Sequence, residues 1–374
     1  MTAMAMACHP DLIIFDEPTT ALDVTTQIEV LVAIRDAVKT YGSAALYISH
    51  DLAVVAQMAD RIMVLRHGKL VEEADTRTML DAPQQDYTRS LWAVRSLRTE
   101  PKPCPPQATP LLEVRKASAS YGHQPVLHDV SLKLYRGQTL AVIGESGSGK
   151  SSTARLITGL LPPTSGQVLY DGKALPADYR QRSKEQLRRL QMIYQIPDTA
   201  LNPRQRIVDI IGRPLSFYLG LKGQALRQRV AELLEMIELD PALYMDRQPR
   251  ELSGGQKQRI CIARALAAEP QLIICDEVTS ALDQLVAEGV LKLLNRIQQQ
   301  LGVAYLFITH DVATVRAIAD EVLVMQRGKV VDHGCREEIF TPPYRDYTGL
   351  LFSSEPEMDP DWLDHLLEKR ALVS

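Results

Sequence analysis

The apolar residues of the chain gather in short runs, and segments with helical spacing separate these runs. Such runs predict buried strands, and their alternation with helices predicts an α/β fold around a mainly parallel sheet. A helix-rich block from about 200 to 268 lies between two predicted strands and indicates an inserted helical subdomain. The predicted strands are Leu111–Val114, Leu132–Leu134, Leu140–Ile143, Gln167–Tyr170, Met192–Tyr194, Leu272–Cys275, Tyr305–Ile308 and Glu321–Met325, and the predicted helices cover about 152–160, 184–190, 225–238, 255–268 and 284–301.

Part of this pattern occurs twice, with a constant offset of 260 positions. Short motifs can coincide by chance, but a register kept without a gap from the N-terminus to about residue 90 indicates an internal repeat. The matching segments are Pro10–Glu17 with Pro270–Glu277, Ala21–Asp23 with Ala281–Asp283, Ile48–Asp51 with Ile308–Asp311, Gly68-Lys69 with Gly328-Lys329, and Asp86–Thr88 with Asp346–Thr348.

The repeat predicts four segments. Residues 1–99 would form a partial first copy, because by the offset the equivalent of Leu111 would precede Met1. Residues 100–110 contain five prolines, which favour an extended linker. Residues 111–340 would form a complete second copy, and 341–374 a C-terminal extension outside the core. A shortened gene, a misplaced start codon and an artificial boundary are all open explanations of the partial copy.

A glycine-rich loop follows the predicted strand at Thr139–Ile143 and precedes a helical segment that begins at Ser152. Its sequence, Gly144-Glu145-Ser146-Gly147-Ser148-Gly149-Lys150-Ser151, fits G-x-x-x-x-G-K-S, the phosphate-binding loop of P-loop nucleotidases. Glycines let backbone N–H groups curl around an anion, and the helix N-terminus adds partial positive charge. Lys150 can reach the β- and γ-phosphates, and the Ser151 hydroxyl can bind Mg²⁺. The loop, with Ser152, therefore predicts an ATP site.

Composition narrows the class of protein. Hydrophobic residues make up 45% and charged residues 24% of the chain, which is ordinary for a globular protein. The net charge of −4 shows no excess of basic residues of the kind that favours nucleic-acid binding. No apolar run approaches the length of a membrane span, and the N-terminus lacks the basic region of a secretory signal. The five cysteines are scattered, so zinc, an iron–sulfur cluster and a disulfide framework are unsupported.

Two acidic residues, Asp276 and Glu277, end the predicted strand Leu272–Cys275. Neighbouring carboxylates repel each other at the end of an apolar strand, so a cation site is favoured over a structural role. Asp276 suits Mg²⁺ coordination, and Glu277 could polarise an attacking water.

Further candidates come from other strand ends and from one helix start. Ser253, Gly254, Gly255 and Gln256 precede a helix and suit a second anion site. His310 follows the strand Tyr305–Ile308, where a phosphate contact competes with a structural role. Gln195 follows another strand and could contact Mg²⁺ or the attacking water. Tyr121, before the glycine-rich loop, could stack on a purine or pack on its own strand.

These motifs, in this order along the chain, resemble the ATP-binding cassette (ABC) ATPases that drive ABC transporters. The resemblance covers nearly the whole chain, because the first copy supplies Asp16-Glu17, Ala21–Asp23 and His50. It implies a P-loop NTPase fold with a mainly parallel core sheet, an antiparallel β subdomain and an inserted helical subdomain. It also implies catalytic roles for Glu277, His310, Gln195 and Lys150, and Mg²⁺ binding by Ser151, Gln195 and Asp276.

The same resemblance implies partners. Family members pair two cassettes so that the phosphate loop of one and the signature Ser253–Gln256 of the other clamp one ATP. A narrower similarity, to dipeptide, oligopeptide and nickel importers, rests on Tyr194–Arg204, on Pro342–Leu351 and on its first-copy equivalent Ala82–Leu91. It implies membrane permease subunits, a solute-binding protein acting through them, and a peripheral location on the cytoplasmic face of the plasma membrane.

Two other interpretations stay open. One is a soluble ABC ATPase of translation or DNA maintenance, although the chain lacks the long basic or coiled-coil insertions that such proteins tend to carry. The other is a remnant that binds ATP without turnover. In the partial copy the phosphate loop and the signature are absent, so activity would require a second cassette from another chain. Its strand Ala45–Ile48 is expected to present an open apolar edge.

Overall fold

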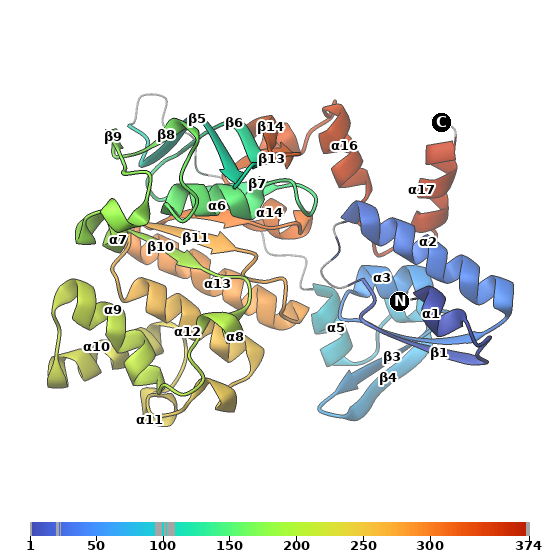
Figure 1. Cartoon of the computed structure of the whole chain (residues 1–374). Helices are drawn as coiled ribbons and strands as arrows, with labels where there is room; N and C mark the ends of the chain where they lie inside the picture. The colour runs from blue at the N-terminus through green and yellow to red at the C-terminus, as the bar shows by residue number, and fades with distance from the viewer. Residues whose placement is uncertain are drawn as a thin grey trace. The chain divides into compact units, whose positions relative to one another are not determined.

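The computed structural model describes residues 2–19, 22, 24–93, 99–100, 102 and 109–371 (Figure 1). The chain divides into two compact units. The N-terminal unit contains Met1–Ser96 and Asp346–Ser374, together with Asp283–Leu285. The central unit contains Leu97–Leu282 and Val286–Arg345. The repeat residues Ala21 and Asp23 and most of the proline-rich segment lie outside the described residues.

The central unit is built on a six-stranded sheet in the order β10-β11-β12-β7-β13-β14. All neighbouring strands are parallel except β13 and β14, which form an antiparallel hairpin. Every residue of β7, β11 and β12 is buried, which matches the short, wholly apolar runs of the sequence. The strands are β7 (Thr139–Ile143), β10 (Leu190–Ile193), β11 (Leu272–Asp276), β12 (Ala304–Ile308), β13 (Glu321–Gln326) and β14 (Lys329–Cys335).

A second, antiparallel sheet of the central unit has the order β6-β5-β8-β9. Its inward residues join the core of the parallel sheet, where Leu112, Val130 and Val168 share a cluster with Leu140 and Ile274. The antiparallel subdomain and the parallel sheet expected from the sequence are both present. The strands are β5 (Leu112–Tyr121), β6 (Gln124–Leu134), β8 (Ser165–Tyr170) and β9 (Lys173–Ala174).

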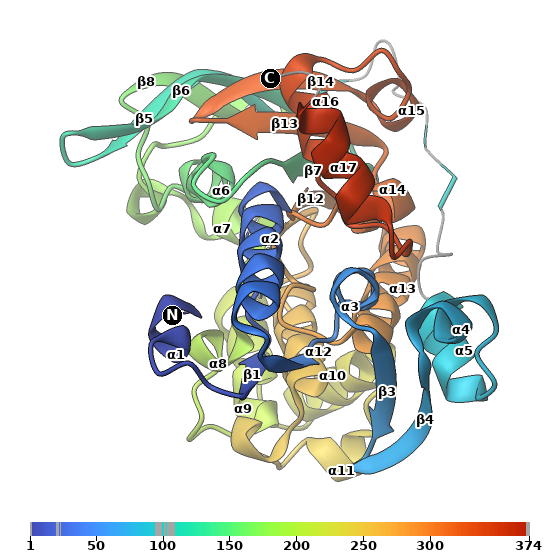
Figure 2. The same cartoon turned by 90° about the vertical axis from the view of Figure 1, so that its right-hand side faces the viewer.

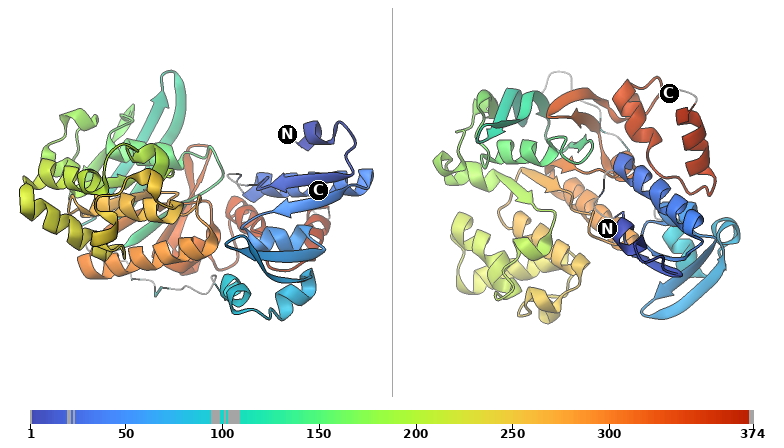
Figure 3. Two further views of the ribbon diagram at one scale, coloured as in Figure 1. Left: turned by 90° about the horizontal axis from the view of Figure 1, so that it is seen from below. Right: turned by 45° about the vertical axis from the view of Figure 1, so that its right-hand side comes forward.

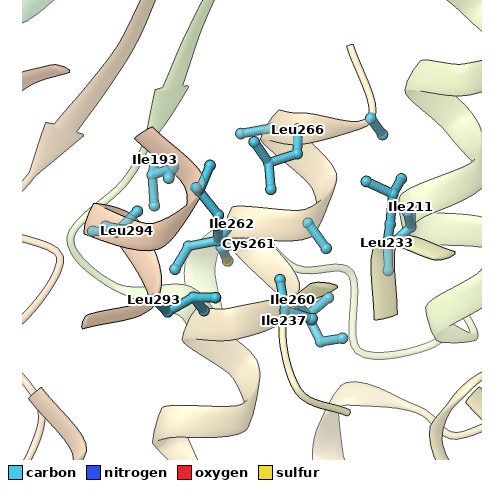
Figure 4. Packing of buried hydrophobic residues seen from close by; sticks show 14 of the residues in the cluster. Ile193, Ile211, Leu233, Ile237, Ile260, Cys261, Ile262, Leu266, Leu293 and Leu294 are labelled. Atoms are coloured by element: carbon cyan, nitrogen blue, oxygen red, sulfur yellow. The ribbon is translucent and has the colours of Figure 1, made fainter. Parts of the chain in front are cut away.

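The block between β10 and β11 is helical, as the sequence predicts. Its helix α12 lies at the centre of the largest hydrophobic cluster: Figure 4 shows Ile260, Cys261 and Ile262 between residues of α13 on one side and of α9 and α10 on the other. The block contains α8 (Pro197–Ala200), α9 (Ile207–Leu219), α10 (Gly223–Met236), α11 (Pro241–Tyr244), the 3₁₀ turn Pro249–Glu251 and α12 (Gly254–Leu266).

The remaining helices of the central unit connect the strands. Helix α6 (Lys150–Thr158) follows β7, and α13 (Gln284–Leu301) precedes β12. The others are the 3₁₀ turn Tyr179–Gln181, α7 (Lys184–Arg189), α14 (Val312–Ile318) and α15 (Arg336–Ile339). Of these, α14 and α15 are too short for their periodicity to be recognised in the sequence.

The N-terminal unit contains two separate strand pairs. Strands β1 (Leu12–Asp16) and β2 (Ala44–Ile48) are parallel, and β3 (Arg61–Arg66) and β4 (Lys69–Asp75) form a hairpin, drawn in light blue in Figure 3. Figure 2 shows α4 and α5 beside β4. The helices are α1 (Thr2–Met6), α2 (Val24–Tyr41), α3 (Leu52–Met58), α4 (Thr76–Asp81), α5 (Asp86–Ala93), α16 (Asp346–Ser353) and α17 (Trp362–Ala371).

The C-terminal residues differ from the expectation of a tail outside the core. Trp362, Leu363 and Leu366 of α17 are buried with Ile28 and Leu31 of α2 in one hydrophobic cluster. No helix in the described part of the chain combines the length and the apolar character that crossing a bilayer requires.

Candidate functional site

The glycine-rich loop connects the buried strand β7 to helix α6, which begins at Lys150. Two glycines are required by geometry. A Cβ on Gly144 would lie 2.2 Å from the carbonyl oxygen of Met325, and Gly149 has a φ of 106°. A side chain at either position would strain or displace the backbone, because L-residues rarely adopt such angles and a carbonyl cannot move aside cheaply. The loop is therefore held in one shape by its neighbours.

Lys150 is buried beneath this loop. Its Nζ donates hydrogen bonds to the carbonyl oxygens of Gly144 at 2.7 Å and Glu145 at 2.9 Å. The hydroxyl of Ser148 is also buried, and it has no hydrogen-bond partner among the described residues. A buried hydroxyl without a partner is costly, and an anion or water in the loop would satisfy it. Glu145 and Ser152 are half-buried, and Ser146 and Gly147 are exposed.

Asp276 lies at the carboxyl end of β11 and meets the first turn of α6. The Ser151 hydroxyl donates a 3.0 Å hydrogen bond to Asp276 Oδ1. Burial raises the pKa of Asp276, and the bond from Ser151 and the nearby Lys150 oppose that shift. A hydroxyl beside a carboxylate is a donor set that suits Mg²⁺ when phosphate oxygens complete it. No group of three or more His, Cys, Asp or Glu side chains in the described residues could hold a metal ion alone.

Glu277 occupies an unusual backbone position, with a φ of 50°, and its N–H donates to Ile308 O at 2.9 Å. A non-glycine residue in the left-handed region stores strain, which is typical of functional sites. Its carboxylate accepts a 2.6 Å hydrogen bond from Gln195 Nε2, and His310 Nδ1 lies 3.5 Å from the other oxygen. Burial raises the pKa of Glu277, but His310, Lys150 and Gln195 together outweigh burial and hold the pKa below its usual value.

The structure therefore joins the predicted residues of three strand ends. Lys150 and Ser151 follow β7, Asp276 and Glu277 end β11, and His310 follows β12. Carboxyl ends of adjacent parallel strands meet at one edge of a sheet, so this clustering follows from the strand order β11-β12-β7. Gln195, which follows β10, is connected to this group by its hydrogen bond to Glu277.

One residue of this region was not predicted from the sequence. The Arg155 guanidinium donates a 2.9 Å hydrogen bond to the phenol oxygen of Tyr121 and links this tyrosine to α6. The spacing of Arg155 from Lys150 on one helix was a possible signal, but nothing in the sequence pairs Arg155 with Tyr121.

The predicted signature begins α12. Ser253 Oγ accepts a hydrogen bond from Gln256 N, and Gln256 Oε1 accepts one from Ser253 N, which together form a capping box. Gln256 Nε2 also donates to the Tyr244 hydroxyl at 2.9 Å. A Cβ on Gly255 would lie 2.3 Å from Val286 Cγ1, whereas Gly254 has more room. These contacts give Ser253, Gly255 and Gln256 a structural explanation, so a ligand-binding role for this segment stays a prediction.

The N-terminal unit repeats part of this geometry. Glu17 has a φ of 46°, and its N–H donates to Ile48 O at 3.0 Å. His50 Nδ1 lies 2.8 Å from Glu17 Oε1. The offset of 260 positions thus pairs the two units in backbone conformation as well as in sequence.

Comparison with known proteins identifies the family of this site. Residues 127–280 match the family model described as ABC transporter. The chain is 38% identical over 396 residues to the glutathione import ATP-binding protein GsiA of Escherichia coli strain K12. That alignment covers 96% of this chain and 63% of the relative, so the chain spans less than two thirds of the curated relatives it matches.

Solved structures show the same fold. A structure titled ATP binding subunit of ABC transporter has a TM-score of 0.53 and 30% identity, over 61% of this chain and 91% of that chain. The ATP-binding cassette MJ0796, solved as a dimer in a post-hydrolysis state with ADP and Pi, has a TM-score of 0.53 and 29% identity, over 60% of this chain and 98% of that chain.

Proposed function

The chain belongs to the ABC transporter family of ATP-binding proteins, and on that premise we propose that it binds and hydrolyses ATP to power an importer. The observation that carries the proposal is the group of side chains at the carboxyl ends of β7, β11 and β12. There, Ser151 meets Asp276, and Glu277 meets both Gln195 and His310. The donor set beside a phosphate-binding loop fits a nucleotide with its cation.

The residues have distinct roles in this proposal. Lys150 and the loop N–H groups bind the β- and γ-phosphates, and Tyr121 stacks on the base. Ser151, Asp276 and Gln195 hold Mg²⁺, which would neutralise charge that develops on the phosphate oxygens. Glu277 polarises a water, which attacks the γ-phosphate in line with the leaving oxygen. Its lowered pKa keeps this carboxylate ionised, and His310 holds it in place and can contact the γ-phosphate.

The proposal includes a second cassette facing the first. The signature Ser253–Gln256 would then contact the nucleotide bound by another ATPase domain. The dimeric state of the MJ0796 cassette supports this arrangement. The offset of 260 positions supports the finer proposal that residues 1–99 are part of one cassette and 111–340 a complete one. The facing domain would come from another chain or from a complementing fragment.

The transported solute and the partners are proposed from the relatives. The GsiA proteins are named for glutathione import, which favours a peptide or a similar small solute here. The ATPase would act on permease subunits at the cytoplasmic face of the plasma membrane and, through them, on a solute-binding protein.

The test is steady-state ATP hydrolysis by the full chain and by Glu277→Gln. We expect the variant to bind a fluorescent ATP analogue with unchanged affinity and to lose turnover, because glutamine cannot accept a proton. Lys150→Ala should lose binding. Glu235→Gln, an exposed helical glutamate, serves as the matched control. Undiminished hydrolysis by Glu277→Gln would refute the assignment.

The dependence of the rate on protein concentration tests the facing cassette. If two chains pair, turnover per chain should rise with concentration. A rate independent of concentration in a proven monomer would contradict pairing. Nucleotide binding without turnover at any concentration would instead support a remnant that only binds ATP.

A further inference from the structure

The C-terminal segment 357–367 lies on the N-terminal unit, and its hydrogen bonds to that unit span 284 to 329 positions of the chain. Its apolar contact is formed by Trp362, Leu363 and Leu366 of α17. They are buried in one cluster with Ile28 and Leu31 of α2 and Val54 of α3. Burial of three large apolar side chains against three others makes this a packed interface, not a chance contact of a loose tail.

A single buried amide fixes the register of the segment. The Gln57 side chain of α3 donates from Nε2 to the carbonyl oxygens of Glu357, at 2.9 Å, and Asp359. Its Oε1 accepts a 3.0 Å hydrogen bond from Leu363 N. One side chain therefore satisfies three backbone groups on both sides of the start of α17. Loss of such a partner leaves buried polar groups unsatisfied, so Gln57 specifies how the segment binds.

Ion pairs border the apolar contact. Arg77 of α4 contacts both carboxylate oxygens of Asp361, at 2.8 and 2.9 Å, and Arg35 of α2 lies 2.7 Å from Asp364. Exposed pairs contribute little stability, but they favour a segment with acidic residues at these positions.

The surface that binds the segment is not repeated in the central unit. At the offset of 260 positions, Ile28 corresponds to Glu288, Val54 to Thr314 and Gln57 to Ala317. Similarly, Arg35 corresponds to Asn295 and Arg77 to Glu337. Two of the three apolar residues, the amide and both cations are therefore changed, whereas Leu31 corresponds to Leu291, and Glu337 would repel Asp361. The sequence repeat has diverged at most of the residues that contact the segment.

We propose that α2, α3 and α4 form a receptor surface specific for residues 357–367 of the same chain. The chain leaves the N-terminal unit after α5, builds the central unit and returns to the N-terminal unit with α16 and α17. The segment is thus a strap: a second tie between the units, additional to the linker at 100–110. It keeps the N-terminal unit paired with its own central unit, and it does so whether or not the chain hydrolyses ATP.

The strap is tested in the full chain by inserting a protease site between residues 103 and 108. After cleavage, the parent N-terminal fragment should co-elute with the fragment that carries 109–374 in size-exclusion chromatography. Leu363→Asp should weaken this retention about tenfold or more, because it places a carboxylate in an apolar contact. The same substitution on the exposed side of the helix, His365→Asp, is the control and should retain the fragment.

Two milder variants keep the proposal testable if Leu363→Asp fails to fold. Gln57→Ala and Asp361→Arg should each increase dissociation of the cleaved fragments. In the uncleaved chain, both should speed amide exchange in α2 and α3 and leave exchange in β7 unchanged. Dissociation of the cleaved parent overturns the proposal. So does equal retention of the fragment by parent, Leu363→Asp and Gln57→Ala.

Discussion

The two units contain the same pair of parallel strands in very different surroundings. In the central unit, Leu272 and Ile274 of β11 and Leu306 and Ile308 of β12 are fully buried. Their equivalents Leu12 and Ile14 in β1 are 56% and 60% exposed, and Leu46 and Ile48 in β2 are 46% and 45% exposed. The local sequence is nearly the same, so a strand pair forms in both. Burial requires further layers, which the central unit supplies.

The hydrophobic core of the central unit shows which strands and helices cover β11 and β12. Ile274 and Leu306 share a cluster with Leu140 of β7, Leu156 of α6 and Val114 of β5. β12 also pairs with β7 from Tyr305 to Ile308, whereas β2 pairs with β1 alone among the described strands. An apolar strand pair with an exposed face and an open edge invites association with another strand. The comparison shows that the same pair of strand sequences can form in both units, but that its burial, and hence its stability, depends on the neighbouring strands and helices.

The largest effect should come from placing a charge on equivalent strands. Ile274→Asp should destabilise the central unit by about 5 kcal/mol or more, because a carboxylate would be buried without a partner. Ile14→Asp should cost less than about 1 kcal/mol, because its side chain is already exposed. Urea unfolding followed by amide exchange in β11 and β1 measures both. Similar losses at the two positions would show that the face with Ile14 is covered in solution.

The next comparison concerns Glu277 and Glu17, which share an unusual φ and a histidine neighbour. Glu277→Gln should lower turnover by about a hundredfold to ten-thousandfold, the usual contribution of a general base. Glu17→Gln should leave turnover unchanged, because no phosphate-binding loop precedes Glu17 within the described residues. Steady-state rates at saturating ATP decide between them. A comparable loss in Glu17→Gln would place the N-terminal unit in a working site.

A smaller effect is expected where the units have diverged. Gln57→Ala should destabilise the N-terminal unit by about 1 to 3 kcal/mol, because three backbone groups of the tail lose their partner. The reverse change, Ala317→Gln, should not create a second docking surface in the central unit, since Thr314 and Glu337 remain. Exchange protection of α3 and α14 reports each variant. Unchanged protection of α3 in Gln57→Ala would contradict the role given to this amide.

The smallest effect is a pH dependence. Burial raises the pKa of Asp276, whereas the partners of Glu277 hold its pKa below the usual value. As pH falls, protons therefore compete with Mg²⁺ at Asp276 at a higher pH than at an ordinary aspartate, whereas Glu277 stays ionised to a lower pH than an ordinary glutamate. The Mg²⁺ concentration for half-maximal turnover should rise several-fold between neutral pH and about pH 5. A requirement for Mg²⁺ that does not change with pH would contradict competition between protons and Mg²⁺ at Asp276.

Much of the central unit could be predicted because its signals are local. The strands β7, β11 and β12 are unbroken apolar runs, and the glycine-rich loop has a sequence that few other functions require. Strand β14 could not be predicted, because Lys329–Cys335 is polar and half-buried and forms a strand only by pairing with β13. The predicted strand at Met192–Tyr194 is shifted, since pairing with β11 begins at Leu190 and ends at Ile193.

The contacts that join distant parts of the chain were beyond the sequence. Periodicity shows that α17 has apolar residues, but not that Leu363 packs against α2. The bond from Leu363 to Gln57 spans 306 positions, and the bond from Arg155 to Tyr121 joins two segments with no shared motif. Such pairings depend on the whole fold. Only the strand-end residues could be grouped in advance, because their positions follow from strand order.

The separation in sequence between Gln57 and the backbone that it binds also determines how much time passes between the translation of these partners. These partners are 300 positions apart, so a ribosome adding about 5 to 20 residues per second needs about 15 to 60 s between them. Throughout that interval α2 and α3 have emerged without Trp362 and Leu363. Helices α2 and α3 are thus translated well before α17 and complete their packing only after it emerges, so a chaperone that shields α2 has most to protect before α17 leaves the ribosome.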